Sequence, residues 1–240
     1  MIFRRELNKI LWKIGYDISR FTPSTHPLAR RRQLLRSFAI DTVLDIGANT
    51  GQFARELRHD LGYTGRIISF EPQSKIFEAL KANAEGDSAW KVYNWAVGEA
   101  AGEAEINISV DPLSSSLLGV MPAFLKSAPN AKYVGKEVIQ VKPLDSFFSD
   151  YCTTENNVYL KIDTQGFESK VLKGAERSLP RIDTVQMEMS LVPLYQDELL
   201  FHDMCTLMAG KGYTLVSLEE VFADSRSGQL MQVDGIFHRF

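Results

Sequence analysis

Cysteine is scarce in this sequence of 240 residues, where only Cys152 and Cys205 occur. Neither belongs to a CxxC pair, and the four histidines stand far apart in the sequence. We therefore predict no disulfide framework and no zinc-type metal site. Two unpaired thiols suit a reducing compartment, so we expect a cytoplasmic protein.

Long apolar runs are also missing from the N-terminal segment, because charged residues interrupt it. A membrane span needs about 20 mostly apolar residues, and a secretory signal needs an apolar core before a cleavage site. We expect neither here. The overall composition, 45% hydrophobic and 24% charged, is typical of a globular protein, and the length suits one α/β domain.

Positive charge is concentrated at the N-terminus. Residues 1–36 contain nine Lys or Arg against Glu6 and Asp17, which leaves the remaining chain at about −10. Apolar residues recur at helical spacing over Met1–Ser19. We predict a basic amphipathic helical arm over residues 1–38, followed by one domain over 39–240. The arm would contact an anionic membrane surface, a second copy of the chain or its own core, and packing on protein is the favoured alternative.

Short apolar strands alternate with helical segments in the rest of the chain. This order predicts an α/β fold with a mostly parallel sheet, helices on both faces and an antiparallel edge strand formed by the last segment. Residues 111–136 are rich in Pro, Ser and Gly and predict a long loop that shapes a substrate surface. The expected strands are Thr42–Ile46, Arg66–Phe70, Trp90–Ala96, Glu103–Val110, Glu137–Val141, Val158–Ile162, Asp183–Met189, Tyr213–Ser217 and Leu230–Phe237. The expected helices of this domain are Gln52–His59, Ser74–Ala84, Gly166–Lys173 and Glu198–Lys211, and Leu28–Phe38 precedes them.

A glycine turn follows the first expected strand, with the sequence Asp45-Ile46-Gly47-Ala48-Asn49-Thr50-Gly51. Gly47 lets the backbone approach a ligand, and Gly51 lets the next helix pack closely. A dinucleotide fingerprint needs a second glycine where Asn49 stands, and there is no GxxxxGK[ST] motif. A nucleoside without phosphates therefore fits this turn better than NAD or a nucleoside triphosphate.

An acidic residue follows the second expected strand. Glu71 lies 24 residues after Gly47, where a carboxylate can accept both hydroxyl hydrogens of a ribose. Taken alone, Glu71 would be interpreted as a solvated acidic residue at the end of a strand. Together with the glycine turn it predicts a site for an adenosine-type ligand.

These motifs resemble those of class I S-adenosylmethionine-dependent methyltransferases, and the chain as a whole resembles the FkbM family. The resemblance extends over residues 40–240. Its distinguishing stretches are Leu160–Glu168 (LKIDTQGFE), Val171–Ala175 (VLKGA), Glu188 and the Ser-Ser-Leu feature within Ser114–Leu117. Gln165 departs from the pattern, because many relatives have Glu at that position.

The resemblance implies a Rossmann-like class I methyltransferase fold with a seven-stranded sheet, and O-methylation of a hydroxyl on a sugar, a glycan or a secondary metabolite. S-adenosylmethionine is the implied cofactor, and a small molecule or glycan is the implied acceptor. The implied cofactor-binding residues are Asp45, Gly47, Ala48, Asn49, Gly51, Glu71, Pro72, Asn94, Ala96 and Asp163.

Two carboxylates stand at consecutive strand ends. Asp163 follows one expected strand and Glu188 lies near the end of the next, so they meet if the strands are neighbours. Removing the proton of an acceptor hydroxyl needs a general base, and Asp163 is our first choice. Lys161 or Glu168 would orient it. The less favoured alternative makes Asp163 and Glu188 ligands of Mg²⁺, and His202 and His238 are weaker candidates for the base.

Three other functions remain to be separated from this one. An NAD-dependent oxidoreductase or a nucleotide-sugar enzyme is the runner-up, and Asn49 argues against it. A nucleic-acid methyltransferase is disfavoured, because no Asn-Pro-Pro-Tyr-type motif occurs and the domain is acidic, so we expect no nucleic-acid partner. A binding module without turnover is the third.

Overall fold

The computed structural model describes residues 2–240, with side chains from Arg5 onward. The chain forms two compact units, of which the first ends at Ser37 and the second spans Phe38–Phe240. None of the described helices is both long enough and apolar enough to cross a bilayer.

The first unit contains helix α1 (Ile2–Trp12) and helix α2 (Pro27–Ser37). The expected helix over Met1–Ser19 is thus too long, because Gly15 adopts a left-handed φ of +81° and the chain turns there. The Asn8 side chain then hydrogen-bonds to Asp17 and to the backbone of Ile18. These contacts fold the segment after the turn back along α1. The predicted contact of this arm with a membrane surface, a second copy of the chain or its own core stays a prediction.

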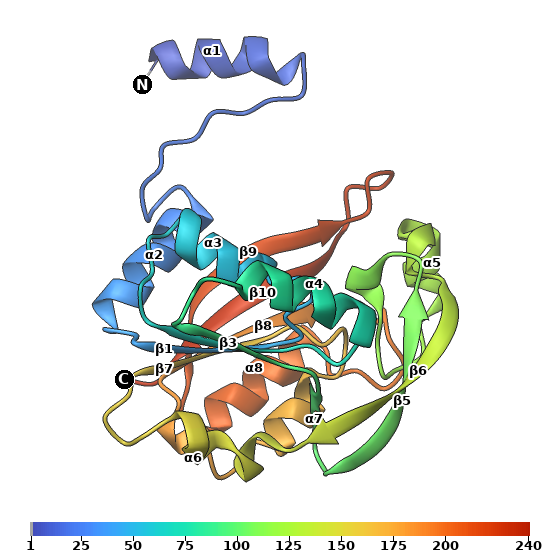
Figure 1. Ribbon diagram of the computed structural model, residues 1–240. Helices are drawn as coiled ribbons and strands as arrows, with labels where there is room; N and C mark the ends of the chain where they lie inside the picture. Colours follow the sequence, from blue (N-terminus) through green and yellow to red (C-terminus); the bar gives the residue numbers. More distant parts are fainter. Residues whose placement is uncertain (1) are drawn as a thin grey trace. The chain divides into compact units, whose positions relative to one another are not determined.

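The second unit is built on a seven-stranded sheet, whose order is β3-β2-β1-β7-β8-β10-β9 (Figure 1). Its strands are β1 (Thr42–Ile46), β2 (Arg66–Phe70), β3 (Trp90–Tyr93), β7 (Val158–Ile162), β8 (Thr184–Ser190), β9 (Thr214–Ala223) and β10 (Leu230–His238). The first five of these pair in parallel, and β10 is antiparallel to both of its neighbours. The predicted α/β class is confirmed. The antiparallel strand is not at the edge, however, because β9 pairs outside it.

Helices cover both faces of this sheet (Figure 1). Helices α3 (Gln52–His59) and α4 (Ser74–Ala84) lie on one face, and α6 (Phe148–Tyr151), α7 (Glu168–Lys173) and α8 (Phe201–Gly210) lie on the other. Three alternate residues of β7, namely Val158, Leu160 and Ile162, belong to the core beneath α7 and α8. The intervening residues Tyr159 and Lys161 therefore point to the opposite face.

A second, three-stranded sheet was not predicted. It consists of β4 (Ala96–Val97), β6 (Tyr133–Lys142) and β5 (Gly102–Ser109), in that order. The expected strand Trp90–Ala96 is divided between the two sheets. The expected loop over 111–136 ends earlier, because β6 pairs with β5 from Tyr133 onward. Before β6 this segment forms α5 (Pro122–Ser127) and two 3-10 turns, Pro112–Ser114 and Pro129–Ala131. Two further 3-10 turns are Leu144–Ser146 and Leu179–Arg181.

The sheet order places a crevice between β1 and β7. The chain runs outward from β1 through β2 to β3, and later returns to form β7 on the other side of β1. In open parallel sheets, ligands bind beyond the carboxyl ends of the strands at such a reversal. The glycine turn after β1 and Asp163 after β7 lie at this point of the fold.

Candidate functional site

A pocket of about 500 Å³ lies at the carboxyl ends of the parallel strands. Eight of the predicted cofactor-binding residues line it: Asp45, Gly47, Ala48, Asn49, Glu71, Pro72, Ala96 and Asp163. The three predicted catalytic residues, Lys161, Asp163 and Glu188, line it as well. The wall on the side of the small sheet comes from Ile106, Asp111–Leu117, Phe124 and Ala128.

The glycine turn after β1 is held against β2. The N–H groups of Gly47 and Ala48 both donate to the carbonyl oxygen of Phe70, each at 3.0 Å. Gly47 has a φ of +77°, and a Cβ on it would lie 1.8 Å from the carbonyl oxygen of Asp163. Only glycine therefore allows the turn to pass this close to the end of β7.

Glu71 is buried at the end of β2, with 3% of its surface exposed. One carboxylate oxygen accepts the N–H of Asn49 at 2.9 Å, and the other accepts the N–H of Gln73 at 2.8 Å. Burial raises the pKa of Glu71 to about 7, although these hydrogen bonds oppose the shift. Two carboxylate oxygens offer about four acceptor positions, so Glu71, which lines the pocket, can still accept a hydroxyl hydrogen there.

Asp45 is fully buried in β1 and accepts a hydrogen bond from the hydroxyl of Ser69 at 3.0 Å. The indole N–H of Trp90 donates to the same hydroxyl. Burial raises the pKa of Asp45 to about 7. These hydrogen bonds link Asp45 of β1 through Ser69 of β2 to Trp90 of β3.

Two predicted cofactor-binding residues do not line the pocket. Gly51 begins α3 with a φ of +85°, and a Cβ there would collide with Trp90 and Leu80. It permits close packing of the helix, as its position in the turn suggested. Asn94 donates hydrogen bonds to the carbonyl oxygens of Glu71 and Pro72. It fixes the backbone after β2 instead of bordering the pocket.

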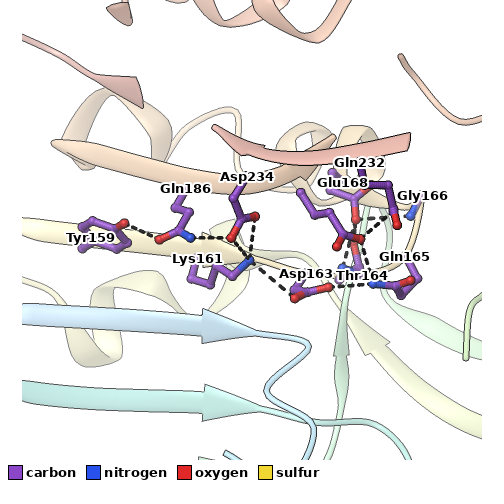
Figure 2. A network of polar contacts seen from close by, with 11 residues as sticks. Tyr159, Lys161, Asp163, Thr164, Gln165, Gly166, Glu168, Gln186, Gln232 and Asp234 are labelled. Atoms are coloured by element: carbon purple, nitrogen blue, oxygen red, sulfur yellow. Dashed lines mark hydrogen bonds and ion pairs between the residues drawn. The ribbon is translucent and has the colours of Figure 1, made fainter. Parts of the chain in front are cut away.

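Lys161 lies at the centre of a buried polar network (Figure 2). Its ammonium nitrogen is 3.1 Å from Asp234 Oδ1 and 3.4 Å from Asp163 Oδ2. Burial alone lowers the pKa of a lysine, but the carboxylates of Asp234, Asp163 and Glu188 outweigh it and raise the pKa of Lys161. These contacts place a paired, protonated Lys161 beside Asp163.

Asp163 and Glu188 are brought together as predicted, because β7 and β8 are parallel neighbours. The carboxamide of Gln165 donates to Asp163 Oδ1 and to Glu188 Oε2, both at 2.9 Å. The Asp163 side chain is 36% exposed toward the pocket, whereas Glu188 is buried. Burial and the charge of Asp163 raise the pKa of Glu188 well above its usual range.

Glu168 stabilises the turn that follows Asp163. Its Oε1 accepts the N–H and the hydroxyl of Thr164 and the N–H of Gly166 (Figure 2). Burial raises the pKa of this carboxyl to about 7. Glu168 is outside the pocket lining, so it acts on the site through the turn and not by direct contact.

The two histidines considered as bases are misplaced for that role. His238 stacks on Phe38 and hydrogen-bonds to Thr184 at the beginning of β8, which is the opposite end of the sheet from the pocket. His202 is exposed on α8 and does not line the pocket. Neither can reach an acceptor beside Asp163.

Sequence reasoning missed Asp234 and Gln232, which project from β10 into the same network. A signal was present, because these two polar residues alternate with Met231 and Val233 in an otherwise apolar segment. Such alternation on a buried strand indicates a polar interior face. Lys161 was a second signal, because a lysine within a buried apolar strand needs an anionic partner beside it.

The charged side chains in the pocket lining are mainly acidic. Five carboxylates, those of Asp45, Glu71, Asp111, Asp163 and Glu188, line it. Among the described lining residues Lys161 is the one basic side chain, and it is already paired with Asp234 and Asp163. A pyrophosphate in this pocket would therefore find no unpaired basic side chain among the described lining residues.

The sheet order, the glycine turn after β1 and the strand-end acids together define a Rossmann-like class I methyltransferase fold. The model of the methyltransferase FkbM domain matches residues 45–215, which is more than half of the chain. The chain belongs to the FkbM methyltransferase family.

Similar solved structures include the methyltransferase FkbM from Methylobacillus flagellatus KT, with a TM-score of 0.50 and 16% identity. That match covers 82% of this chain and 43% of the other, so this chain spans less than half of that protein. An uncharacterized protein from Listeria monocytogenes serotype 4b matches with a TM-score of 0.48 and 7% identity, covering 88% of this chain and 67% of the other. The structure of LepI in complex with SAM matches with a TM-score of 0.45 and 13% identity. That match covers 94% of this chain and 50% of the other. No curated protein sequence matches this chain.

Proposed function

We propose that this protein uses S-adenosylmethionine to methylate a hydroxyl group of a sugar, a glycan or a secondary metabolite. The observation that carries the proposal is the arrangement of Glu71 and Asp163 in one pocket, on either side of the glycine turn. The first suits a ribose and the second suits an acceptor hydroxyl. When bound, the cofactor supplies an electrophilic methyl group on a positively charged sulfur.

The acidic lining supports this cofactor over NAD or a nucleotide sugar. A sulfonium is attracted by the nearby carboxylates, whereas a pyrophosphate would meet them without a free cation among the described lining residues. Asn49, with a φ of +47°, also places a side chain where a dinucleotide fingerprint has glycine. The Glu71 carboxylate lines the pocket and can accept a ribose hydroxyl hydrogen there.

Asp163 is the proposed general base. Its carboxylate is exposed to the pocket and is held by Lys161 and Gln165. It takes the proton of the acceptor hydroxyl as the oxygen forms its bond to the methyl carbon and the carbon–sulfur bond breaks. Lys161 stays protonated and orients Asp163, while Glu188 supports it through Gln165.

The deciding experiment offers the protein isotope-labelled S-adenosylmethionine with a panel of neutral glycans and small hydroxyl compounds, with and without a chelator. Label in a methyl ether of a panel member is the expected result. In parallel, thermal unfolding with adenosylhomocysteine or NAD⁺ identifies the cofactor, because a ligand that binds the folded state raises Tm. Stabilisation by NAD⁺ alone contradicts the proposal and favours the oxidoreductase.

A further inference from the structure

The Gln165 carboxamide lies between the two acids of the site. Both of its N–H bonds are used. One donates to Asp163 Oδ1 at 2.9 Å (Figure 2), and the other donates to Glu188 Oε2 at 2.9 Å. An oxygen of each acid accepts from this nitrogen, so the nitrogen end of the amide faces the two acids. The two carboxylates are thus joined through a neutral donor.

The opposite end of this amide is fixed as well. The hydroxyl of the buried Tyr195 donates to Gln165 Oε1 at 2.7 Å, and the hydroxyl of Ser116 donates to the backbone carbonyl of Gln165 at 2.6 Å. Gln165 also has a φ of +55°, which is unfavourable for a residue with a Cβ. Contacts from two other segments maintain this conformation, so the amide cannot turn its nitrogen away without losing the hydrogen bond to Tyr195.

We propose that the Gln165 carboxamide is a positioning group that occupies the place between Asp163 and Glu188 where a divalent cation would otherwise bind, so that the acid pair works without a metal. This inference rests on the proposed function only in treating the pair as the catalytic acids. Hard cations bind where several carboxylate oxygens converge. Here the converging oxygens are satisfied by an amide, and by Gln232, which donates to the same oxygen of Glu188 at 2.8 Å.

The charge balance of the network agrees with this arrangement. Lys161 supplies the positive charge that the pair requires, from a position next to Asp163. Among the residues that the structure describes, no three acidic, histidine or cysteine side chains are grouped to hold a metal ion. A carboxylate at position 165 would supply the third ligand, and the residue at this position would thereby determine whether the site takes a cation.

The test is a titration of the full chain with Mn²⁺. The relaxation rate of the water protons is the readout of Mn²⁺ binding. We expect no saturable binding by the wild type below about 1 mM. Gln165→Glu is expected to bind Mn²⁺ at least about tenfold more tightly than the wild type, because it adds a third carboxylate. Adding Asp163→Asn to this variant should abolish the gain, which locates the cation at the pair.

Gln165→Ala is the second variant, because the charged replacement can fail to fold. It removes the bridge without adding charge, and we expect saturable Mn²⁺ binding weaker than that of Gln165→Glu. Gln229→Glu is the matched control, since Gln229 is exposed and lies in the turn between β9 and β10. It should leave Mn²⁺ binding at the wild-type level.

Two results would overturn the inference. One is wild-type Mn²⁺ binding well below 1 mM that Asp163→Asn abolishes, because the amide would then not occupy the cation position. The other is binding by both Gln165 variants that equals the wild type. Adenosylhomocysteine binding, measured on the same samples, reports separately on the proposed function.

Discussion

The carbonyl oxygen of Asp163 lies 1.8 Å from the position that a Cβ on Gly47 would take. The glycine turn after β1 and the segment after β7 therefore approach each other closely through their backbones. A side chain at position 47 would therefore have to displace the backbone at Asp163.

The first prediction concerns that contact. Gly47→Ala should lower the free energy of unfolding by about 2–5 kcal/mol, from the left-handed φ and the collision together. Gly62→Ala is the control, because Gly62 has a φ of +66° but no atoms within 4 Å of an added Cβ. It should cost only about 1–2 kcal/mol. Urea unfolding measures both, and equal losses would show that the contact is unimportant.

The second prediction is a pH dependence of cofactor binding. Burial raises the pKa of Glu71 to about 7, so acid protonates a group that must accept ribose hydroxyls. Ionised Glu71 is the form that binds the ribose. Its population is highest above this pKa and falls as the pH is lowered through it. Calorimetry should give a dissociation constant for adenosylhomocysteine about tenfold weaker at pH 6 than at pH 8.

Glu71→Gln extends this prediction with a matched variant. At pH 8 it should weaken adenosylhomocysteine binding by about tenfold, and its remaining pH dependence should be shallower. Glu78→Gln, an exposed change on α4, should match the wild type at both pH values. An unaltered dissociation constant in Glu71→Gln would remove the ribose assignment.

The third prediction separates binding from chemistry. Asp163→Asn keeps the shape of the side chain but loses the base, so methyl transfer should fall by about 10²–10⁴-fold while adenosylhomocysteine binding is retained. Labelled methyl transfer measures the first quantity and calorimetry the second. Turnover at the wild-type rate would exclude Asp163 as the base.

The fourth prediction concerns the buried cation. Lys161→Met leaves Asp234 and Asp163 without their ammonium partner and should lower the free energy of unfolding by about 3–5 kcal/mol. Lys136→Met breaks the exposed pair with Glu105, and should change it by no more than about 1 kcal/mol. Thermal unfolding compares the two. Similar small losses would mean that the buried network contributes little to stability.

Much of the fold was predictable from the sequence. The strands Thr42–Ile46, Arg66–Phe70 and Val158–Ile162 have the predicted bounds, as do the helices Gln52–His59 and Ser74–Ala84. Each is a local pattern bounded by a turn or a charged residue, and local patterns determine local structure. The small sheet was missed, because β5 and β6 pair across a segment with its own helix and turns.

The sequence by itself determined the glycine turn, the acid after the second strand and the strand-end acids, because each of these is a local pattern of residues at the end of a short apolar strand. Only the tertiary structure decided that Lys161 pairs with Asp234, 73 residues away, and that Gln165 bridges Asp163 and Glu188. The physical reason is that these contacts depend on which strand lies beside which. That order is a property of the assembled sheet and not of any single segment.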